Sequence, residues 1–198
     1  MAIDSPPRVV TGARAEHDDE CIDLWVAAVA ARDGVPESPS VRARAREKFA
    51  VPRVALLVAV DDPVAVDALV AVDALDAVDV VSDGAPGSSS RADGRSAPIA
   101  GFCLVTAPRT GMPGDPVDAA YLSLLAVRPD GQGSGLGRTL LGGAVEAARS
   151  AGSARCVLHA LEDNAPALRL YRSAGFEPLG EPFPHALSGR PTRRYVAG

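Results

Sequence analysis

A glycine-rich segment restricts the possible folds of this chain more than any other part of its sequence. Gly131 to Gly137 contains four glycines and follows an apolar run of strand length at residues 119–127. The helical pattern after it ends near Gly152, and its apolar face is Leu136, Leu140, Leu141, Ala144, Val145 and Ala148. Between a strand and a helix start, unpaired backbone N–H groups and the helix dipole converge on one point, so the segment favours a phosphate or other anion. A plain turn is the alternative for such a loop by itself.

Two common phosphate-binding loops do not fit the spacing of these glycines. A Walker loop requires Gly-Lys-Ser/Thr, but Leu136 follows Gly135 and Arg138 follows Gly137. The dinucleotide fingerprint G-x-G-x-x-G would need a glycine at position 136 or 138. Gly133, Gly135 and Gly137 would still let the backbone approach a pyrophosphate, because a side chain there would obstruct it or forbid the required dihedral angles.

Strands and helices alternate along the rest of the chain, which predicts an α/β fold built on one sheet. Further strands are expected at residues 8–13, 54–60, 99–106 and 156–160 and near Phe176 and Tyr195. Apolar spacing indicates helices at 21–29, 41–49 and 165–174, of which the first is stopped by Gly34 and Pro36.

Local features support the first two of these helices. Three acidic residues, Asp18 to Glu20, are expected in the first turn of the first helix, where they favour the positive end of its dipole. Ser40 is expected to cap the second helix. The basic residues of that helix are expected to form a solvated face rather than a binding patch; they are Arg42, Arg44, Arg46 and Lys48.

The segment between two of the expected strands has an unusual composition. Residues 61–96 repeat Val-Asp-Ala-Leu at 66–69 and 72–75 and then become rich in glycine and serine. Eight aspartates against one arginine lie between Asp61 and Gly94, so the rest of the chain is nearly neutral. We expect a low-complexity acidic insertion that connects two paired strands at the surface and lies outside the active site.

Composition narrows the class of protein further. The 198 residues, 47% hydrophobic and 23% charged, suit a single domain over residues 1–198. A net charge of -5 argues against nucleic acid as a partner. No stretch approaches the roughly 20 apolar residues of a membrane span and no secretory signal begins the chain, so we expect a cytoplasmic protein without a membrane partner.

Cysteine and histidine usage predicts no metal site. Cys21, Cys103 and Cys156 lie far apart among apolar neighbours, which is typical of buried thiols. The three histidines, His17, His159 and His185, have no second ligand at suitable spacing.

Two motifs resemble the signatures of the GCN5-related N-acetyltransferase (GNAT) superfamily. Gln132-Gly-Ser-Gly135-Leu-Gly137 is similar to the family pattern Gln/Arg-x-x-Gly-x-Gly/Ala, and Leu125-Ala-Val127-Arg-Pro129 before it looks like the family's strand exit. Downstream, the segment from Leu161 to Phe176 resembles the family's fifth strand and the helix that leads into Gly-Phe. The close resemblance covers about residues 121–176.

This resemblance implies a GNAT fold and a cosubstrate, acetyl-CoA. The fold would be a mixed central sheet of about six to seven strands flanked by about four helices, with strands 121–127 and 156–160 splayed apart at the CoA cleft. The family's pyrophosphate site would be the backbone of Gln132, Gly133, Ser134, Gly135, Leu136 and Gly137, and its pantetheine site the backbone of Leu125, Ala126 and Val127. Arg138 would contact a phosphate, or would simply face solvent at a helix start.

The downstream motif supplies Asn164 and Tyr171, which are seven residues apart and therefore on nearly the same face of one helix. By resemblance, Asn164 would bind the CoA arm and Tyr171 would protonate the departing thiolate. The alternatives are a helix cap for Asn164 and, for Tyr171, a core aromatic residue packed against Leu168 and Phe176.

The expected activity is N-acetyl transfer from acetyl-CoA directly to a primary amine of a small molecule or protein. The general base stays open, because Tyr121 and Ser123 occupy the strand where histone-acetylating members carry a glutamate. The candidates are Asp118, His159, Glu162 and His185. A different acyl-CoA donor and a non-catalytic acyl-CoA sensor are the alternative functions, and both monomer and homodimer remain open. The acceptor pocket is expected at residues 32–40 and 181–194.

Overall fold

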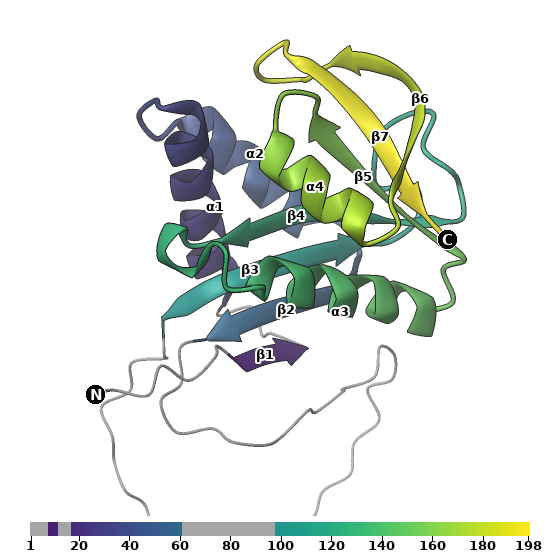
Figure 1. Ribbon diagram of the computed structural model, residues 1–198, viewed down its shortest axis with the longest axis horizontal. Coiled ribbons are helices and arrows are strands. Elements are labelled where there is room, and N and C mark those ends of the chain that lie inside the picture. Colours follow the sequence, from purple (N-terminus) through teal and green to yellow (C-terminus); the bar gives the residue numbers. More distant parts are fainter. Residues whose placement is uncertain (1–7, 12–16, 61–97) are drawn as a thin grey trace, which may run out of the picture.

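A seven-stranded mixed sheet organises the molecule (Figure 1). The computed structural model describes residues 8–11, 17–60 and 98–198. The spatial order is β1-β2-β3-β4-β5-β7-β6, and among these described strands only β4 and β5 pair in parallel. The strands are β1 (Arg8–Thr11), β2 (Arg53–Val60), β3 (Ile99–Thr106), β4 (Ala119–Val127), β5 (Arg155–Leu161), β6 (Glu177–Pro184) and β7 (Pro191–Ala197).

Two helices cover each face of the sheet. Helices α1 (Asp18–Asp33) and α2 (Pro39–Phe49) bury Cys21, Ile22 and Phe49 against one face. Helices α3 (Leu136–Ser150) and α4 (Ala165–Ser173) bury Leu140 and Leu168 against the other. The expected α/β fold, with six to seven strands and four helices, is confirmed.

Most helix boundaries follow local chemistry, with one correction. The acidic first turn of α1 is present, and Gly34 ends that helix in the left-handed conformation, φ 64°. Ser40 does not cap α2: the N-cap is Ser38, and Pro39 occupies the first helical position, where its missing N–H costs nothing. The helix therefore begins two residues earlier than its apolar pattern predicted.

Strands β4 and β5 separate after a short parallel contact. Their pairing covers only Ala119 to Tyr121 on β4 and Arg155 to Val157 on β5. Beyond Tyr121, the β5-facing edge of β4 has no strand partner among the described residues. This splay was expected from the family resemblance, and it opens the sheet at its centre.

A β-bulge lies at this point of β4. Leu104 of β3 pairs with Leu124 and Val105 pairs with Leu122, which leaves Ser123 as the extra residue. Leu122 consequently packs on the α3 face, whereas Leu124 packs on the α1–α2 face. The bulge thus reverses the alternation of β4 next to the splay.

Of the other predictions about the chain, the structure confirms some and does not test the rest. The expected insertion at 61–96 lies outside the described residues, but the strands that it connects, β2 and β3, do pair antiparallel. All three cysteines are buried and free, as predicted. Among the residues that the structure describes, no helix is long and apolar enough to cross a membrane. The single domain over 1–198 and the cytoplasmic location stay predictions.

Candidate active site

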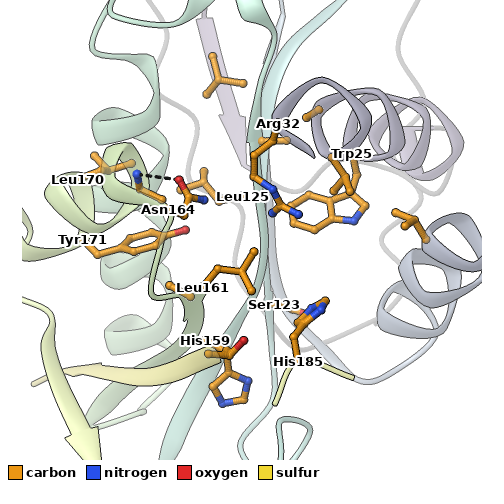
Figure 2. Close-up of a pocket in the computed structure, with 18 of the residues that line it drawn as sticks. Trp25, Arg32, Ser123, Leu125, His159, Leu161, Asn164, Leu170, Tyr171 and His185 are labelled. Atoms are coloured by element: carbon orange, nitrogen blue, oxygen red, sulfur yellow. Dashed lines mark hydrogen bonds between the residues drawn. The ribbon is translucent and has the colours of Figure 1, made fainter. Parts of the chain in front are cut away.

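A cavity of about 1270 Å³ lies where β4 and β5 separate. The splayed strands, both helices of the α1–α2 face, the start of α3, helix α4 and the β6–β7 hairpin all contribute to its wall. Figure 2 shows Asn164, Leu170 and Tyr171 on one side, Trp25 and Arg32 of α1 on the other, and Leu125 of β4 between them. The cavity therefore has a wall built from the downstream motif and a separate wall built from the N-terminal helices.

The glycine loop presents three backbone amides that the fold does not use. A short 3₁₀ turn, Pro129–Gly131, begins the loop, and the amides of Gln132 and Ser134 are consumed by turn hydrogen bonds to Pro129 and Gly131. The amides of Gly133, Gly135 and Gly137 have no hydrogen-bond partner among the described residues. All three glycines line the cavity at the N-terminus of α3. Their N–H groups therefore form a site for an anion.

Backbone conformation explains two of these glycines. Gly133 and Gly135 have φ of 86° and 89°, which L residues rarely adopt, so glycine is required by conformation rather than by space. A Cβ on Gly137 would lie 3.4 Å from Cδ2 of Leu170, an ordinary contact.

The remaining residues predicted in the loop differ in their position. Gln132 and Arg138 line the cavity, whereas Ser134 and Leu136 do not. The Ser134 hydroxyl instead accepts a weak bond from the Leu136 amide at 3.3 Å and donates to the Gly131 carbonyl at 2.6 Å. Arg138 is exposed and makes no ion pair in the described part of the chain, so both readings of this residue remain open.

The predicted pantetheine wall and the downstream motif meet at the same cavity. Leu125, Ala126 and Val127 line it from β4, and Asn164 and Tyr171 line it from α4. Asn164 is also the N-cap of α4, since its side-chain oxygen accepts from the Ala167 amide at 3.3 Å. The structure thus shows the cap and leaves the cavity-facing role open.

Tyr171 is placed both to pack and to donate a proton. Its ring lies 6.2 Å from that of Phe176, centroid to centroid. Its hydroxyl has no hydrogen-bond partner in the described structure and points toward the centre of the pocket (Figure 2). Burial raises the pKa of Tyr171 well above its ordinary value of 10.0, so the hydroxyl keeps its proton at neutral pH.

Two of the four candidate bases lie away from the cavity. Asp118 bonds to Arg155, Glu162 bonds to Arg193 at 2.9 Å, and neither acid lines the cavity. The two that do line it are His159 on β5 and His185 on the β6–β7 hairpin. The structure therefore reduces the candidates at the cavity wall to the two histidines.

His159 belongs to a buried hydrogen-bond network. Its Nε2 lies 2.8 Å from Oδ1 of Asp115, which also accepts from Nε of Arg194 at 2.8 Å. Because the carboxylate only accepts, Nε2 of a neutral His159 carries the proton and Nδ1 is left as an acceptor. Nδ1 lies 3.4 Å from the Tyr121 hydroxyl.

Asp115 is held in its charged form. Burial alone would raise its pKa, but hydrogen bonds from His159, the Met112 amide and Arg194 outweigh burial and lower the pKa below 3.8. Burial raises the pKa of Tyr121 far above 10.0, and the nearby Asp115 carboxylate adds to this effect. The network at neutral pH therefore consists of a carboxylate, a histidine and a neutral phenol.

Lys48 completes the network, which corrects its assignment to a solvated face. Its Nζ donates to the Tyr121 hydroxyl at 3.0 Å, to the Ser123 carbonyl at 3.1 Å and to the Ser123 hydroxyl at 3.3 Å. Burial lowers the pKa of Lys48 from 10.5 to about 8, and the neighbouring Arg44 charge adds to the shift. Arg44 and Arg46 are exposed, as predicted.

The sequence did contain a pattern that indicates the inward position of Lys48. Val41, Ala45 and Phe49 form the packed stripe of α2, and Lys48, three residues after Ala45 and seven after Val41, borders it. Asp115 and Arg194 had no such signal, because one lies in a turn-rich loop and the other on the last strand.

The two segments expected to shape the acceptor pocket both line the cavity, and one arginine connects them. Arg190 Nη1 donates to Asp33 Oδ1 at 2.8 Å, and Nη2 donates to Asp163 Oδ2 at 2.6 Å. Hydrogen bonds from Arg32 and Arg190 lower the pKa of Asp33 to about 2 against the opposing effect of burial. The β6–β7 hairpin is thereby tied to the end of α1 and to the residue before Asn164.

The described side chains include no candidate metal site. In the described ranges, no group of three or more His, Cys, Asp or Glu side chains could hold a metal ion. The predicted absence of a metal stays a prediction.

The chain matches known acetyltransferases in sequence and in structure. The model of the Acetyltransferase (GNAT) family matches residues 85–176. A mycothiol acetyltransferase from Thermobifida fusca is 45% identical over 64 residues, which are 32% of this chain and 19% of that protein. The chain thus spans about a fifth of the length of this curated relative.

Solved structures with the same fold cover almost the whole chain. The ribosomal-protein-S18-alanine N-acetyltransferase from Escherichia coli superposes with a TM-score of 0.58 and 18% identity, over 96% of this chain and 97% of that one. The PaiA N-acetyltransferase from Thermoplasma acidophilum, solved with coenzyme A, gives 0.57 and 14% over 94% and 98%. At these identities the neighbours establish the fold alone. The match to the family model over residues 85–176 and the shared fold both support the GNAT resemblance that the motifs indicated.

Proposed function

We propose that this protein transfers the acetyl group of acetyl-CoA directly to a primary amine. One observation carries the proposal: three glycine amides and the Tyr171 hydroxyl, none of which has a hydrogen-bond partner among the described residues, face the same cavity at the splay of β4 and β5. The amides suit a pyrophosphate, and the hydroxyl suits a leaving thiolate.

The cosubstrate would lie along the unpaired edge of β4. Amides of Gly133, Gly135 and Gly137 would bind the pyrophosphate, since they offer N–H groups at the positive end of α3. The backbone of residues 125–127 would bind the pantetheine arm as an added strand. The PaiA neighbour was solved with coenzyme A, which supports this class of cosubstrate.

The transfer itself forms a C–N bond and breaks a C–S bond. A neutral amine attacks the thioester carbonyl, and the sulfur leaves as a thiolate that takes the proton of Tyr171. The amine must lose a proton in the same reaction. A base is therefore required on the acceptor side of the cavity.

The Asp115–His159–Tyr121 network can accept that proton. As Tyr121 takes the proton from the amine, it passes its own to Nδ1 of His159, and the Asp115 carboxylate stabilises the resulting imidazolium. The 3.4 Å between the Tyr121 hydroxyl and Nδ1 is long, as catalytic contacts often are before substrate binds. Tyr121 would then do through His159 what a strand carboxylate does in other members of the family.

The test is turnover with a panel of donors and acceptors. Acetyl-, succinyl- and longer acyl-CoA are each incubated with small amines, amino acids and peptides, while thiol release is followed and products are weighed by mass spectrometry. We expect acetylated amine with acetyl-CoA as the best donor. Tight acetyl-CoA binding without any amine-dependent thiol release would indicate a sensor, and a preference for another donor would change the acyl group.

A further inference from the structure

Lys48 is a partly buried cation whose hydrogen-bond partners in the described part of the chain are all neutral oxygen atoms. Its three hydrogen-bond partners are the Tyr121 hydroxyl and the carbonyl and hydroxyl oxygens of Ser123. In the described residues no carboxylate lies within ion-pair distance of its Nζ. Buried charges in proteins are usually paired, so the missing counter-ion points to a ligand.

The other cations on this side of the cavity already have acidic partners. Arg32 pairs with Asp33 at 2.7 Å and Arg44 pairs with Glu47 at 2.8 Å. Arg190 pairs with two aspartates. Among the described cations of this wall, the Lys48 ammonium is thus the one without an acidic partner. It helps to lower the pKa of His185, after burial and Arg32.

This charge lies next to the point of reaction. Nζ of Lys48 is 4.9 Å from the centroid of the Tyr121 ring, and Tyr121 lines the same cavity as Tyr171. Ser123 and Lys48 both line the cavity. An anion bound here would therefore lie beside Tyr121, in the same cavity as Tyr171.

We propose that the acceptor is an amino acid, whose carboxylate binds the Lys48 ammonium and the Ser123 hydroxyl while its amine faces the Tyr121 hydroxyl. The proposal rests on the proposed function and specifies its acceptor. The three N–H groups of Lys48 already have three oxygen acceptors, so the carboxylate would replace the most distant of them, the Ser123 hydroxyl at 3.3 Å, and that hydroxyl would donate to the second carboxylate oxygen. The positive charge also favours the neutral form of the amine, which is the form that attacks.

The experiment measures the binding of reaction products, because an acetylated amine no longer titrates. Calorimetry with CoA present compares N-acetyl-glycine, N-acetyl-L-alanine and N-acetyl-L-phenylalanine with their C-terminal amides. For at least one side chain we expect the carboxylate to bind about ten- to a hundredfold more tightly than the amide, the range for a hydrogen bond to a charged group. Lys48→Met should abolish this difference by weakening the carboxylate alone.

Arg46→Met is the matched control, since it removes one positive charge from the exposed side of the same helix. It should leave the carboxylate preference within about twofold of the parent protein. Equal binding of acids and amides, or binding of neither, would overturn the proposal, as would a preference that survives Lys48→Met. If the parent protein itself does not bind acetyl-CoA, the result would instead count against the proposed function.

Discussion

Replacing Tyr171 with phenylalanine removes only the hydroxyl group, and so tests its catalytic role separately from the packing of the ring. The substitution keeps the ring and its contact with Phe176, and the hydroxyl that it removes has no hydrogen-bond partner in the described structure. We therefore expect the free energy of unfolding to change by less than about 0.5 kcal/mol. A lost general acid should lower kcat by about 10²- to 10⁴-fold, which corresponds to about 3 to 5 kcal/mol in the barrier.

The assay follows thiol release with saturating acetyl-CoA and an amine that the parent protein acetylates. Calorimetry should give nearly the same acetyl-CoA affinity for both proteins, and urea unfolding should give nearly the same stability. Since the pKa of Tyr171 lies well above 10.0, we also expect no loss of kcat from its ionisation up to about pH 9.

Tyr195→Phe is the matched control for this substitution. Tyr195 is 2% exposed, lies on β7 outside the cavity, and loses the same single oxygen atom. Its kcat should stay within about twofold of the parent value. If kcat of Tyr171→Phe is less than about tenfold lower than that of the parent protein, the general-acid role is refuted and Tyr171 is a packing residue.

Three further predictions test the other parts of the site. Gly135→Val should abolish acetyl-CoA binding in calorimetry, because φ of 89° excludes a branched side chain, whereas Gly142→Ala on α3, with no neighbour within 4 Å, should bind normally. His159→Gln should lower kcat by about 10²- to 10⁴-fold with unchanged acetyl-CoA affinity; a larger effect of His185→Gln would assign the base to His185 instead. Between about pH 8 and 10.5 the unfolding free energy of the parent protein should rise relative to that of Lys48→Met, because the unfolded chain then binds more protons at Lys48 than the folded chain does. The buried cysteines and tyrosines have raised pKa values that act in the opposite direction, and Arg44 and His185 also face this lysine; these groups are present in both proteins, so the measurement is the difference between the two pH profiles.

The parts of the site that were predictable from sequence are those built by local backbone chemistry. The strand, loop and helix from Ala119 to Ser150 follow from an apolar run, glycines and an amphipathic pattern, and two of those glycines do have positive φ. Asn164 at the start of α4 is likewise local, since an asparagine before Ala-Pro is a typical N-cap. Such features depend on residues within one or two turns of each other.

The acceptor side could not be predicted in the same way, because long-range contacts build it. Asp115 meets His159 across 44 residues of sequence, and Lys48 meets Tyr121 across 73. The bulge at Ser123 also reverses the alternation of β4, so a simple period of two would place Leu125 with Tyr121 although it packs on the opposite face. No pattern within a single element carries this information.

Amide resonances of the glycine loop provide the most direct test of the proposed CoA site. In ¹⁵N-labelled protein, titration with CoA should shift the amide signals of Gly133, Gly135 and Gly137 downfield to saturation, because each N–H gains an anionic acceptor. Pantetheine, which lacks the pyrophosphate, should leave these three signals in place while it perturbs residues 125–127. CoA binding that saturates without moving the three glycine amides would contradict the account.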